Sequence, residues 1–446
     1  VDRMIHQRLD TFLRRKRCTL LGVGPMSVNC VDAAIELANE HEVPIFLIAS
    51  RRQIDSEQFG GGYVNGWTTD AFASYVLDRD KKGKILLARD HGGPWQSLVE
   101  KEAGLGLRRA LESAKDSYRA DLEAGFQVLH IDPSVDIHGT PGVDEVLERI
   151  YELYEFCWDQ AQRLRQEVAF EVGTEEQSGS TNSQEELDYT LNAIQHFCKR
   201  NHLPMPSFVV IQSGTRVMER RNVGSFDSPV RVANEIPSEI QLPKMIEICN
   251  RYGIFMKEHN TDYLSDEALA WHPRLGIHAA NVAPEFGVAE TVALLDVLES
   301  HGLDALSERF QALALASRKW DKWMLDDTRA TDRDRAIIAG HYVFARPECV
   351  EIKAEAASVL APRGIVLDAH LKQVVKASIT RYLTNFRLVS ASQANARLPQ
   401  ASLAPSVGEP GSGRARGRSQ AGAGQSQVPL PLLGGAPGHA RALEYA

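Results

Sequence analysis

Residues 84–94 read KILLARDHGGP. The apolar run at 85–88 predicts a buried strand that leads into Asp90 and His91, and the glycines and proline at 92–94 then end it. This pattern is typical of α/β proteins, which present ionisable groups at strand ends beside glycines that let a ligand approach closely. A carboxyl group beside an imidazole can transfer protons, or the imidazole can hold a metal.

The same pattern of an apolar run ending in polar residues recurs along the chain. Further strands are predicted at residues 18–24, 44–50, 126–132, 168–174, 207–213, 253–258 and 275–281. Helices are predicted at residues 29–41, 96–125, 144–166, 183–201, 242–252 and 265–272. Strands that alternate with helices pair in parallel, and eight such units predict a closed (β/α)8 or TIM barrel. An open doubly wound sheet is the alternative, but the sequence lacks its glycine-rich dinucleotide fingerprint.

Composition divides the chain into three parts. Residues 1–287 are predicted to form the barrel, and residues 288–388 a C-terminal helical extension packed on it. Within the extension, the charged tract at 318–335 is predicted to be a solvated helix face. Residues 389–446 are rich in Gly, Pro, Ala, Ser and Arg, so we expect a disordered low-complexity tail.

Bulk composition excludes several classes of function. The 446 residues are 43% hydrophobic and 24% charged, as in ordinary globular proteins. A net charge of −9 without a basic stripe argues against nucleic-acid binding, and no apolar run reaches transmembrane length, so no membrane partner is expected. The six cysteines are scattered without CxxC pairs, which predicts reduced, mostly buried thiols in a cytoplasmic protein.

In a barrel, groups at the C-terminal ends of the strands meet at one mouth. Two imidazoles and a carboxylate there, His91, His259 and Glu175, can form a divalent-metal site, with zinc as the expected ion. The alternative for each single residue is a structural role or substrate binding alone. Asp90 and Glu176 are the predicted catalytic carboxylates. The predicted substrate-binding residues are Asp132, Ser213, Gly214, Asn260 and Asn281. Glycine-containing strand ends also suit a phosphate group, because their backbone N–H groups can point at its oxygens.

Five separated motifs carry a family resemblance. They are QFGGGY with TTDAF at 58–72, DHGGPW at 90–95, HID at 130–132, VGTE at 172–175 and EHNTDY at 258–263. In this order they resemble the tagatose-bisphosphate aldolase Z-type accessory subunit family, over about residues 15–350. That family is itself similar to metal-dependent (class II) ketose-bisphosphate aldolases.

The resemblance implies roles for four residues. His91 and His259 match metal ligands, Asp90 matches the proton-transfer acid, and Asn281 matches a substrate-holding residue. Class II aldolases supply a third histidine after strand six, where this chain has SGT at 213–215, so Glu175 is predicted to replace it.

Three functions follow from these observations. The first is a metal-dependent aldolase acting on a ketose (bis)phosphate or related sugar, by enolate chemistry. The second is a non-catalytic subunit that supports a separate class II aldolase, or that assembles with copies of itself. The third is a sugar-phosphate kinase, ranked last because the sequence has no P-loop or kinase-type glycine loop. Lys257 shares a strand face with His259 and could form a Schiff base, but pairing with a barrel carboxylate is the favoured prediction.

Overall fold

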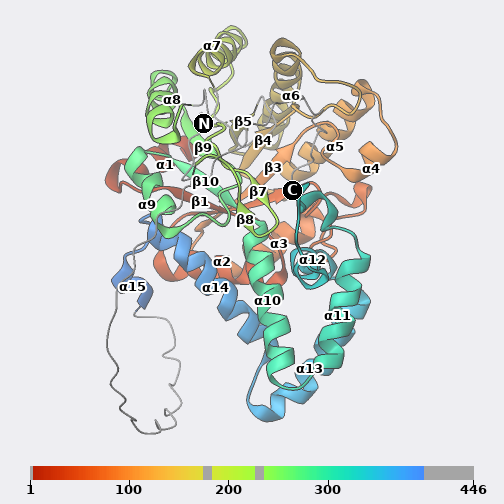
Figure 1. Ribbon diagram of the computed structural model, residues 1–446. Helices are drawn as coiled ribbons and strands as arrows, with labels where there is room; N and C mark the ends of the chain where they lie inside the picture. The colour runs from red at the N-terminus through yellow and green to blue at the C-terminus, as the bar shows by residue number, and fades with distance from the viewer. Residues whose placement is uncertain (1–3, 174–182, 227–235, 396–446) are drawn as a thin grey trace, which may run out of the picture.

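A computed structural model describes residues 4–173, 183–226 and 236–395. Eight parallel strands close a barrel in the order β1-β10-β9-β6-β5-β4-β3-β2 (Figure 1). The strands are β1 (Leu20–Val23), β2 (Ile45–Ser50), β3 (Ile85–Gly92), β4 (Val128–Ile131), β5 (Ala169–Val172), β6 (Phe208–Val210), β9 (Phe255–Glu258) and β10 (Ala279–Val282). The predicted TIM barrel is therefore confirmed.

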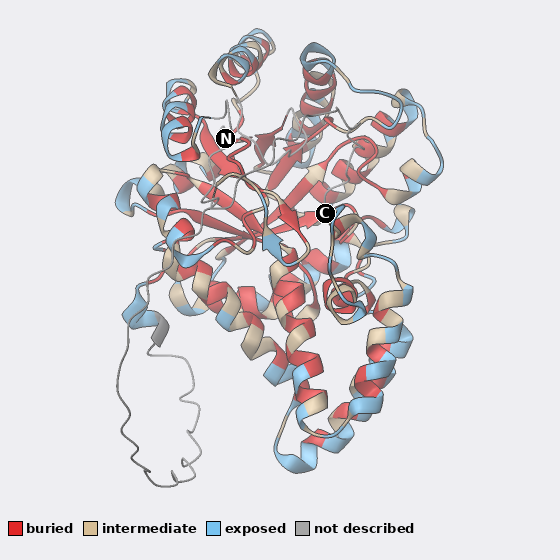
Figure 2. Ribbon diagram, in the orientation of Figure 1, coloured by how far each residue is buried: buried red, intermediate tan, exposed pale blue. Residues whose placement is uncertain are grey.

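One main helix follows each barrel strand, and α1 (Met4–Arg15) precedes the first. These helices are α2 (Val28–His41), α3 (Thr69–Arg79), α5 (Leu107–Ala124), α6 (Val143–Leu164), α7 (Gln184–Arg200), α8 (Ser238–Tyr252), α9 (Asp266–Leu275) and α10 (Pro284–Ser300). Helices cover the outer face of the barrel, so its strands are buried on both faces (Figure 2). This double burial explains why the strands read as continuous apolar runs.

The observed elements differ from the predicted ones mainly at four places. The helix predicted at 96–125 is two helices, α4 (Leu98–Glu102) and α5, because Gly104 between them takes the left-handed φ of +59°. The strand predicted from residue 275 begins four residues later, since α9 continues through Pro273. After β6 the chain forms an unpredicted antiparallel hairpin of β7 (Val217–Met218) and β8 (Arg221–Asn222).

The fourth difference is that β3 does not end at residue 88 but continues through Gly92. Arg89 allows this because it points out of the barrel and forms a buried ion pair with Asp121 of α5, at 2.5 Å from Nη2 to Oδ1. A paired charge can be buried where an unpaired one would end the strand.

The C-terminal extension has a hydrophobic core of its own, built from residues of α10, α11 (Asp304–Ala316), α12 (Asp332–Ala339), α13 (Pro347–Leu360) and the start of α14 (Leu367–Asn385). Its short 3-10 helices are η2 (Asp321–Trp323), η3 (Gly340–Val343) and η4 (Ala361–Arg363), and η1 (Glu57–Phe59) lies in the barrel. The second half of α14 packs beside α2 and joins the barrel core (Figure 1). The division into residues 1–287 and 288–388 stays a prediction.

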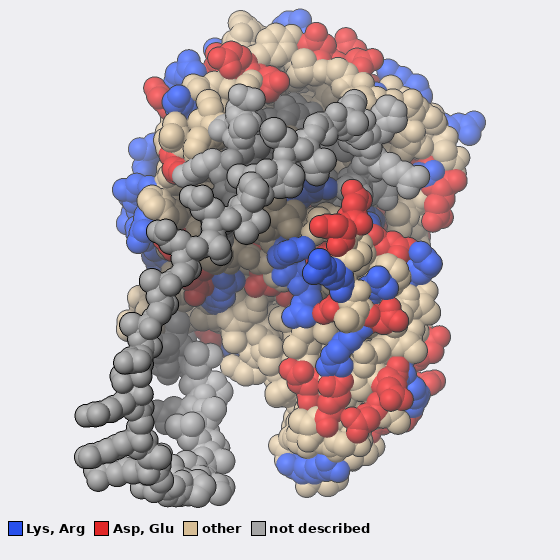
Figure 3. Space-filling view, in the orientation of Figure 1, with Lys and Arg blue, Asp and Glu red and all other residues tan. Residues whose placement is uncertain are grey.

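The prediction that the charged tract at 318–335 is a solvated helix face was wrong. The tract contains η2 and the start of α12 with turns between them, and Trp323 is buried against Val217 of the hairpin. On the face shown in Figure 3, Lys and Arg side chains gather near the position of α12, beside Asp and Glu. The contact with the hairpin explains the error, because tertiary packing decides where such a mixed sequence is buried.

Three further predictions concern the C-terminal tail, the cysteines and membrane-spanning helices. The predicted disordered tail, 389–446, lies outside the described residues from 396 on, and the last described element is the short helix α15 (Ala391–Asn395). All six cysteines are buried and free, as expected. Among the described helices, none is both long and apolar enough to cross a membrane.

Asp262 connects the barrel to the extension. Its Oδ1 accepts hydrogen bonds from the backbone N–H groups of Ala283 and Glu285, at 3.0 and 2.9 Å, where α10 begins. The Glu285 carboxylate in turn accepts hydrogen bonds from Tyr382 and Arg381 of α14. Burial, reinforced by the charge of Glu285, raises the pKa of Asp262 to about 7.

We predict that Asp262→Asn reduces the pH dependence of stability. A carboxyl group whose pKa is raised in the folded state binds its proton more tightly there, so it lowers stability as pH rises from about 4 to about 7. The amide of Asn stays neutral and keeps an oxygen for both backbone donors. Relative to wild type, the variant should gain stability between pH 5 and pH 8, on the order of 3 kcal/mol.

Urea unfolding at the two pH values measures this gain. The exposed Asp304→Asn is the matched control, because it removes the same charge from the first turn of α11. Equal pH profiles for Asp262→Asn and wild type would show that Asp262 is ionised in the folded protein at pH 5.

Candidate functional site

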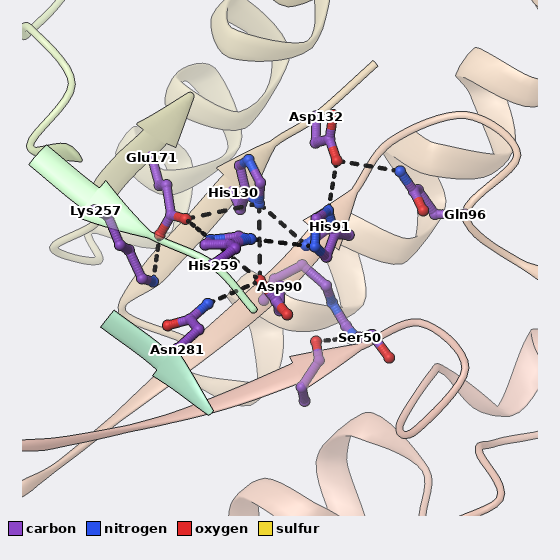
Figure 4. Close-up of polar contacts among 12 residues, drawn as sticks. Ser50, Asp90, His91, Gln96, His130, Asp132, Glu171, Lys257, His259 and Asn281 are labelled. Carbon is purple, nitrogen blue, oxygen red and sulfur yellow. Dashed lines mark hydrogen bonds and ion pairs between the residues drawn. The ribbon is translucent and has the colours of Figure 1, made fainter. Parts of the chain in front are cut away.

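Polar side chains from five strands meet inside the C-terminal end of the barrel (Figure 4). They are Asp90 and His91 of β3, His130 of β4 and Asp132 just after it, Glu171 of β5, Lys257 of β9 and His259 just after it, and Asn281 of β10. All are buried except His91, which is partly exposed. Such a density of buried ionisable groups marks a functional site, because each one must be compensated.

A backbone irregularity in β3 lets two consecutive residues face this cluster. Neighbouring residues of a regular strand point to opposite faces. Here the pairing with β4 shifts register between Arg89 and Gly92, and His91 has a φ of 44°. Asp90 consequently reaches Asn281, with 3.3 Å between Asn281 Nδ2 and Asp90 Oδ1, while the adjacent His91 ring also points inward (Figure 4).

His91 and His259 face each other through ring nitrogens. His91 Nδ1 lies 2.6 Å from Asp132 Oδ2, and His259 Nε2 lies 2.9 Å from Glu171 Oε1. An ionised carboxylate only accepts hydrogen bonds, so both of these ring nitrogens must carry the hydrogen. The other two nitrogens, His91 Nε2 and His259 Nδ1, are 3.2 Å apart. When both rings are neutral, two lone pairs face each other, and only a proton or another cation between them relieves the repulsion.

His130 and Asp90 extend the donor set. Two groups of side chains have donor atoms within 4.8 Å of one another: His91, His130 and His259, and Asp90, His130, Glu171 and His259. His130 Nδ1 accepts a hydrogen bond from the backbone N–H of His91 at 3.2 Å, and its Nε2 is buried with no partner in the described part of the chain. Nitrogen and carboxylate donors at this spacing can hold a divalent metal ion.

The carboxylates of the cluster are ionised. Burial raises the pKa of Asp132 and of Glu171, but hydrogen bonds and cationic neighbours outweigh it and lower both values to about 2. The pKa of Asp90 is lowered as well, against the effect of burial, by the charges of His91 and His259.

The two facing imidazoles differ in protonation. Burial lowers the pKa of His91, but Asp90 and Asp132 outweigh it and raise the pKa to about 9. Burial also lowers the pKa of His259, where Asp90 and Glu171 offset only part of the effect. In the metal-free protein the proton between the two rings therefore belongs to His91 at neutral pH.

Lys257 pairs with Glu171, with 2.6 Å between Nζ and Oε2, and both side chains are fully buried. The favoured prediction for this lysine, a partner for a barrel carboxylate, is confirmed. A lysine whose Nζ is held by a buried carboxylate is not free to attack a carbonyl group, which argues against Schiff-base formation.

The structure places the predicted site residues in three groups. Asp90, His91, Asp132, His259 and Asn281 come together in the cluster. Ser213, Gly214 and Asn260 belong to the loops around the β7–β8 hairpin, where their backbone oxygens accept hydrogen bonds from Ser238, Phe226 and Asn222 respectively. Glu175 and Glu176 lie outside the described residues.

Two residues of the cluster, His130 and Glu171, were assigned no role from the sequence. Each interrupts an apolar strand with one ionisable side chain, and the two are Cα partners in the pairing of β4 with β5. The signal was present in the sequence, because a lone charged residue inside a strand that is buried on both faces must point into the barrel or form an ion pair. Glu171 supplies a carboxylate to the donor set from β5, the strand that precedes Glu175.

Residues 14–330 match the family model described as D-tagatose-1,6-bisphosphate aldolase subunit GatZ/KbaZ-like. The chain belongs to this family. The match covers the barrel and the first part of the extension, up to the turn before α12. The family predicted from the five sequence motifs is thus confirmed.

Solved structures confirm the fold of this GatZ/KbaZ-like protein. A probable tagatose 6 phosphate kinase from Sinorhizobium meliloti 1021 matches with 18% identity and a TM-score of 0.66, covering 82% of this chain and 100% of that one. A fructose-bisphosphate aldolase from Campylobacter jejuni matches with 11% identity and a TM-score of 0.51, covering 86% of this chain and 94% of that one. At these identities the likeness concerns the fold alone.

We predict that Lys257→Met destabilises the GatZ/KbaZ-like protein by about 3 kcal/mol or more, because removing one partner of a buried ion pair leaves the other charge uncompensated. An imidazole of the cluster can take up a proton in place of the lost ammonium charge. The decrease in the free energy of unfolding should therefore be smaller at pH 6 than at pH 9, where the imidazole no longer carries the replacement proton.

Urea unfolding at both pH values measures the loss. The exposed Lys244→Met of α8 is the control and should stay within about 0.5 kcal/mol of wild type. A loss for Lys257→Met as small as that of the control would contradict the buried pair.

Proposed function

We propose that the cluster binds a divalent metal ion and that the protein is a metal-dependent aldolase acting on a ketose (bis)phosphate or related sugar. The facing nitrogens of His91 and His259 support this most directly. Two nitrogens bound to one tetrahedral zinc ion at about 2.1 Å lie about 3.4 Å apart. The separation of 3.2 Å between His91 Nε2 and His259 Nδ1 is close to that value.

His130 is the third imidazole of the proposed ligand set. Asp132 then acts behind His91, where its carboxylate holds the ring in the tautomer that leaves Nε2 available. In the same way, the carboxylate of Glu171 holds the His259 ring in the tautomer that leaves Nδ1 available. A nitrogen-rich donor set of this kind favours zinc over magnesium or calcium, which prefer oxygen ligands.

The charge of the cluster also suits a divalent cation. Asp90, Asp132 and Glu171 carry three negative charges, whereas Lys257 is the one permanently cationic side chain among the residues of the cluster. With neutral imidazoles, two negative charges remain, which is the amount that one divalent ion offsets. A buried net charge of this size is unfavourable without a counter-ion.

The residues of the chain then have distinct roles. Aldol cleavage breaks a carbon–carbon bond and leaves negative charge on the ketone-derived fragment, and a bound metal would supply the Lewis acid that stabilises this charge. Asp90 is ionised and lies beside the ligands, so it can accept the proton of the substrate hydroxyl. Asn281 donates to Asp90 and orients its carboxylate. Glu175 and Glu176 remain predicted ligand and catalytic residues.

Two other functions have support of their own. The family description names a subunit, which favours a supporting partner of a separate aldolase. The kinase rests on the description of the Sinorhizobium meliloti protein, whose 18% identity carries only the fold, so we rank it last. We also propose a cytoplasmic location, because six buried free thiols suit a reducing compartment.

We predict that the purified protein binds one zinc ion and that His91→Ala or His259→Ala weakens this binding at least about 100-fold. Asp132→Asn should weaken binding about 10- to 100-fold, because it removes only the orienting carboxylate. Metal analysis after dialysis measures the stoichiometry, and calorimetry measures the affinities. His370→Ala on the exposed face of α14 is the control. Retention of the ion in both His91→Ala and His259→Ala would exclude the site.

Zinc binding should release about one proton at pH 7. The pKa of His91 is about 9 in the metal-free protein, so its Nε2 is protonated at pH 7 and must lose that proton to bind the ion. The apparent affinity should therefore rise with pH up to about pH 9 and fall in acid. Calorimetry in buffers of different ionisation enthalpy counts the released protons. Release of none would mean that the facing nitrogens do not share the ion.

Catalysis is tested separately, with tagatose 1,6-bisphosphate as the substrate. We predict that Asp90→Asn lowers kcat about 100-fold or more while zinc stays bound, because the variant loses its proton acceptor. A coupled assay for the triose phosphate products measures kcat. If the zinc-bound protein alone has no activity but raises that of an added class II aldolase, the supporting-subunit function is correct instead.

A further inference from the structure

A pocket opens near the cluster, at the seam between the barrel and the extension. It has a volume of about 380 Å³, within the range of small-molecule sites. The barrel contributes the end of β2 and the loop that follows it, and the extension contributes the segment around η2 together with Tyr342. The lining thus combines residues almost 300 positions apart in sequence.

The lining carries an excess of positive charge, in a protein whose net charge is −9. Its charged side chains are Arg51, Arg52, Arg318, Lys319 and Lys322 against Asp55 and Asp321. Even with Glu100, which bonds Arg51 without lining the pocket, cations outnumber carboxylates by five to three. A concave surface of this kind attracts anions.

Two buried donors at the pocket have no hydrogen-bond partner in the described part of the chain. One is Nη2 of Arg51, whose Nε and Nη1 bond Asp55 at 2.9 Å and Glu100 at 2.5 Å. The other is the hydroxyl of Ser50. Both residues are only 3% exposed. Both residues line the cavity, and buried donors without acceptors are unfavourable, which favours a ligand that supplies the acceptor.

The pocket adjoins the cluster. Ser50 is the last residue of β2 and is the Cα partner of Asp90 in β3, and Figure 4 shows the two side chains close together. Arg51 Nη1 also donates to the backbone oxygen of Gly93, just after β3, at 3.3 Å. A ligand as long as a sugar phosphate can therefore reach both places.

We propose that this pocket binds the phosphate group of a sugar phosphate whose carbonyl end lies at the metal cluster. Identification of the ligand as the substrate rests on the proposed aldolase function. Phosphate is the matching chemistry because a dianion offsets the excess of two positive charges and its oxygens accept from Arg51 and Ser50. Lys319 and Lys322 make the extension part of the binding site.

The test measures binding to protein stripped of metal by a chelator, so that it is independent of catalysis. The probes are inorganic phosphate, tagatose 1,6-bisphosphate and unphosphorylated tagatose, each titrated by calorimetry. We expect the two phosphate-containing probes to bind and tagatose to bind at least about tenfold more weakly than the bisphosphate. Absence of phosphate binding to the wild-type protein would overturn the proposal.

Three variants locate the binding. Lys322→Gln and Lys319→Gln remove cations from the extension, and Ser50→Ala removes the hydroxyl that lacks a partner. We expect Lys322→Gln, alone or combined with Lys319→Gln in a double variant, to weaken phosphate binding about tenfold or more. Ser50→Ala should weaken it several-fold. Lys244→Gln, exposed on α8, removes the same charge elsewhere and should change nothing.

Melting temperatures close to wild type show that the variants fold, and Ser50→Ala is the safest in this respect because its hydroxyl makes no bond in the described structure. Unchanged phosphate affinity in both the double variant and Ser50→Ala would overturn the proposal, since the anion would then bind elsewhere. If zinc binding or turnover fails while these variants lose phosphate, the pocket stands and the aldolase function is wrong.

Discussion

The contact between His91 Nε2 and His259 Nδ1 is the constraint on which the centre of this molecule depends. Two carboxylates fix the orientation of the rings, so the facing lone pairs cannot avoid each other by rotation. The protein must therefore hold a cation at this place, either a proton on His91 or an ion. A barrel can maintain this arrangement because its strands are paired on both sides and buried on both faces, which leaves the backbone little freedom to relax.

Glycines make room for the polar cluster at two positions. A Cβ on Gly22 would lie 2.2 Å from Asn281 Oδ1, and a Cβ on Gly173 would lie 2.7 Å from His130 Nε2. Neither contact is tolerated by real side chains, so these glycines preserve space for the residues that line the mouth. Gly24, two residues after Gly22, is likewise close to a neighbouring strand end, since a Cβ there would lie 2.4 Å from the Cβ of Ala283.

The parts of the structure that could be predicted are those that depend on local sequence. The apolar runs located all eight barrel strands. The positions of His91 and His259 at strand ends predicted that both belong to the cluster, because the fold brings such ends together. The role of His130 was missed, although a lone ionisable residue inside a strand that is buried on both faces is itself a signal; what the sequence does not show is that Glu171 is its partner across β4 and β5. The irregularity that turns Asp90 and His91 to the same place has no local signal, because it arises from the register between β3 and β4.

The extension was the least predictable part, because its role depends on contacts over long sequence distances. Residues 318–322 look like a solvated charged tract until the fold places them against the loop after β2. The resulting arrangement puts an acidic, nitrogen-rich cluster that suits a cation next to a basic pocket that suits an anion. Arg51 lies between the cluster and the pocket. Asp55 and Glu100 pair with its guanidinium, which also donates a hydrogen bond to the backbone oxygen of Gly93 after β3. The proposed substrate, a phosphorylated ketose, fits this separation of charge, because its carbonyl oxygen would meet the Lewis acid while its phosphate lies in the basic pocket.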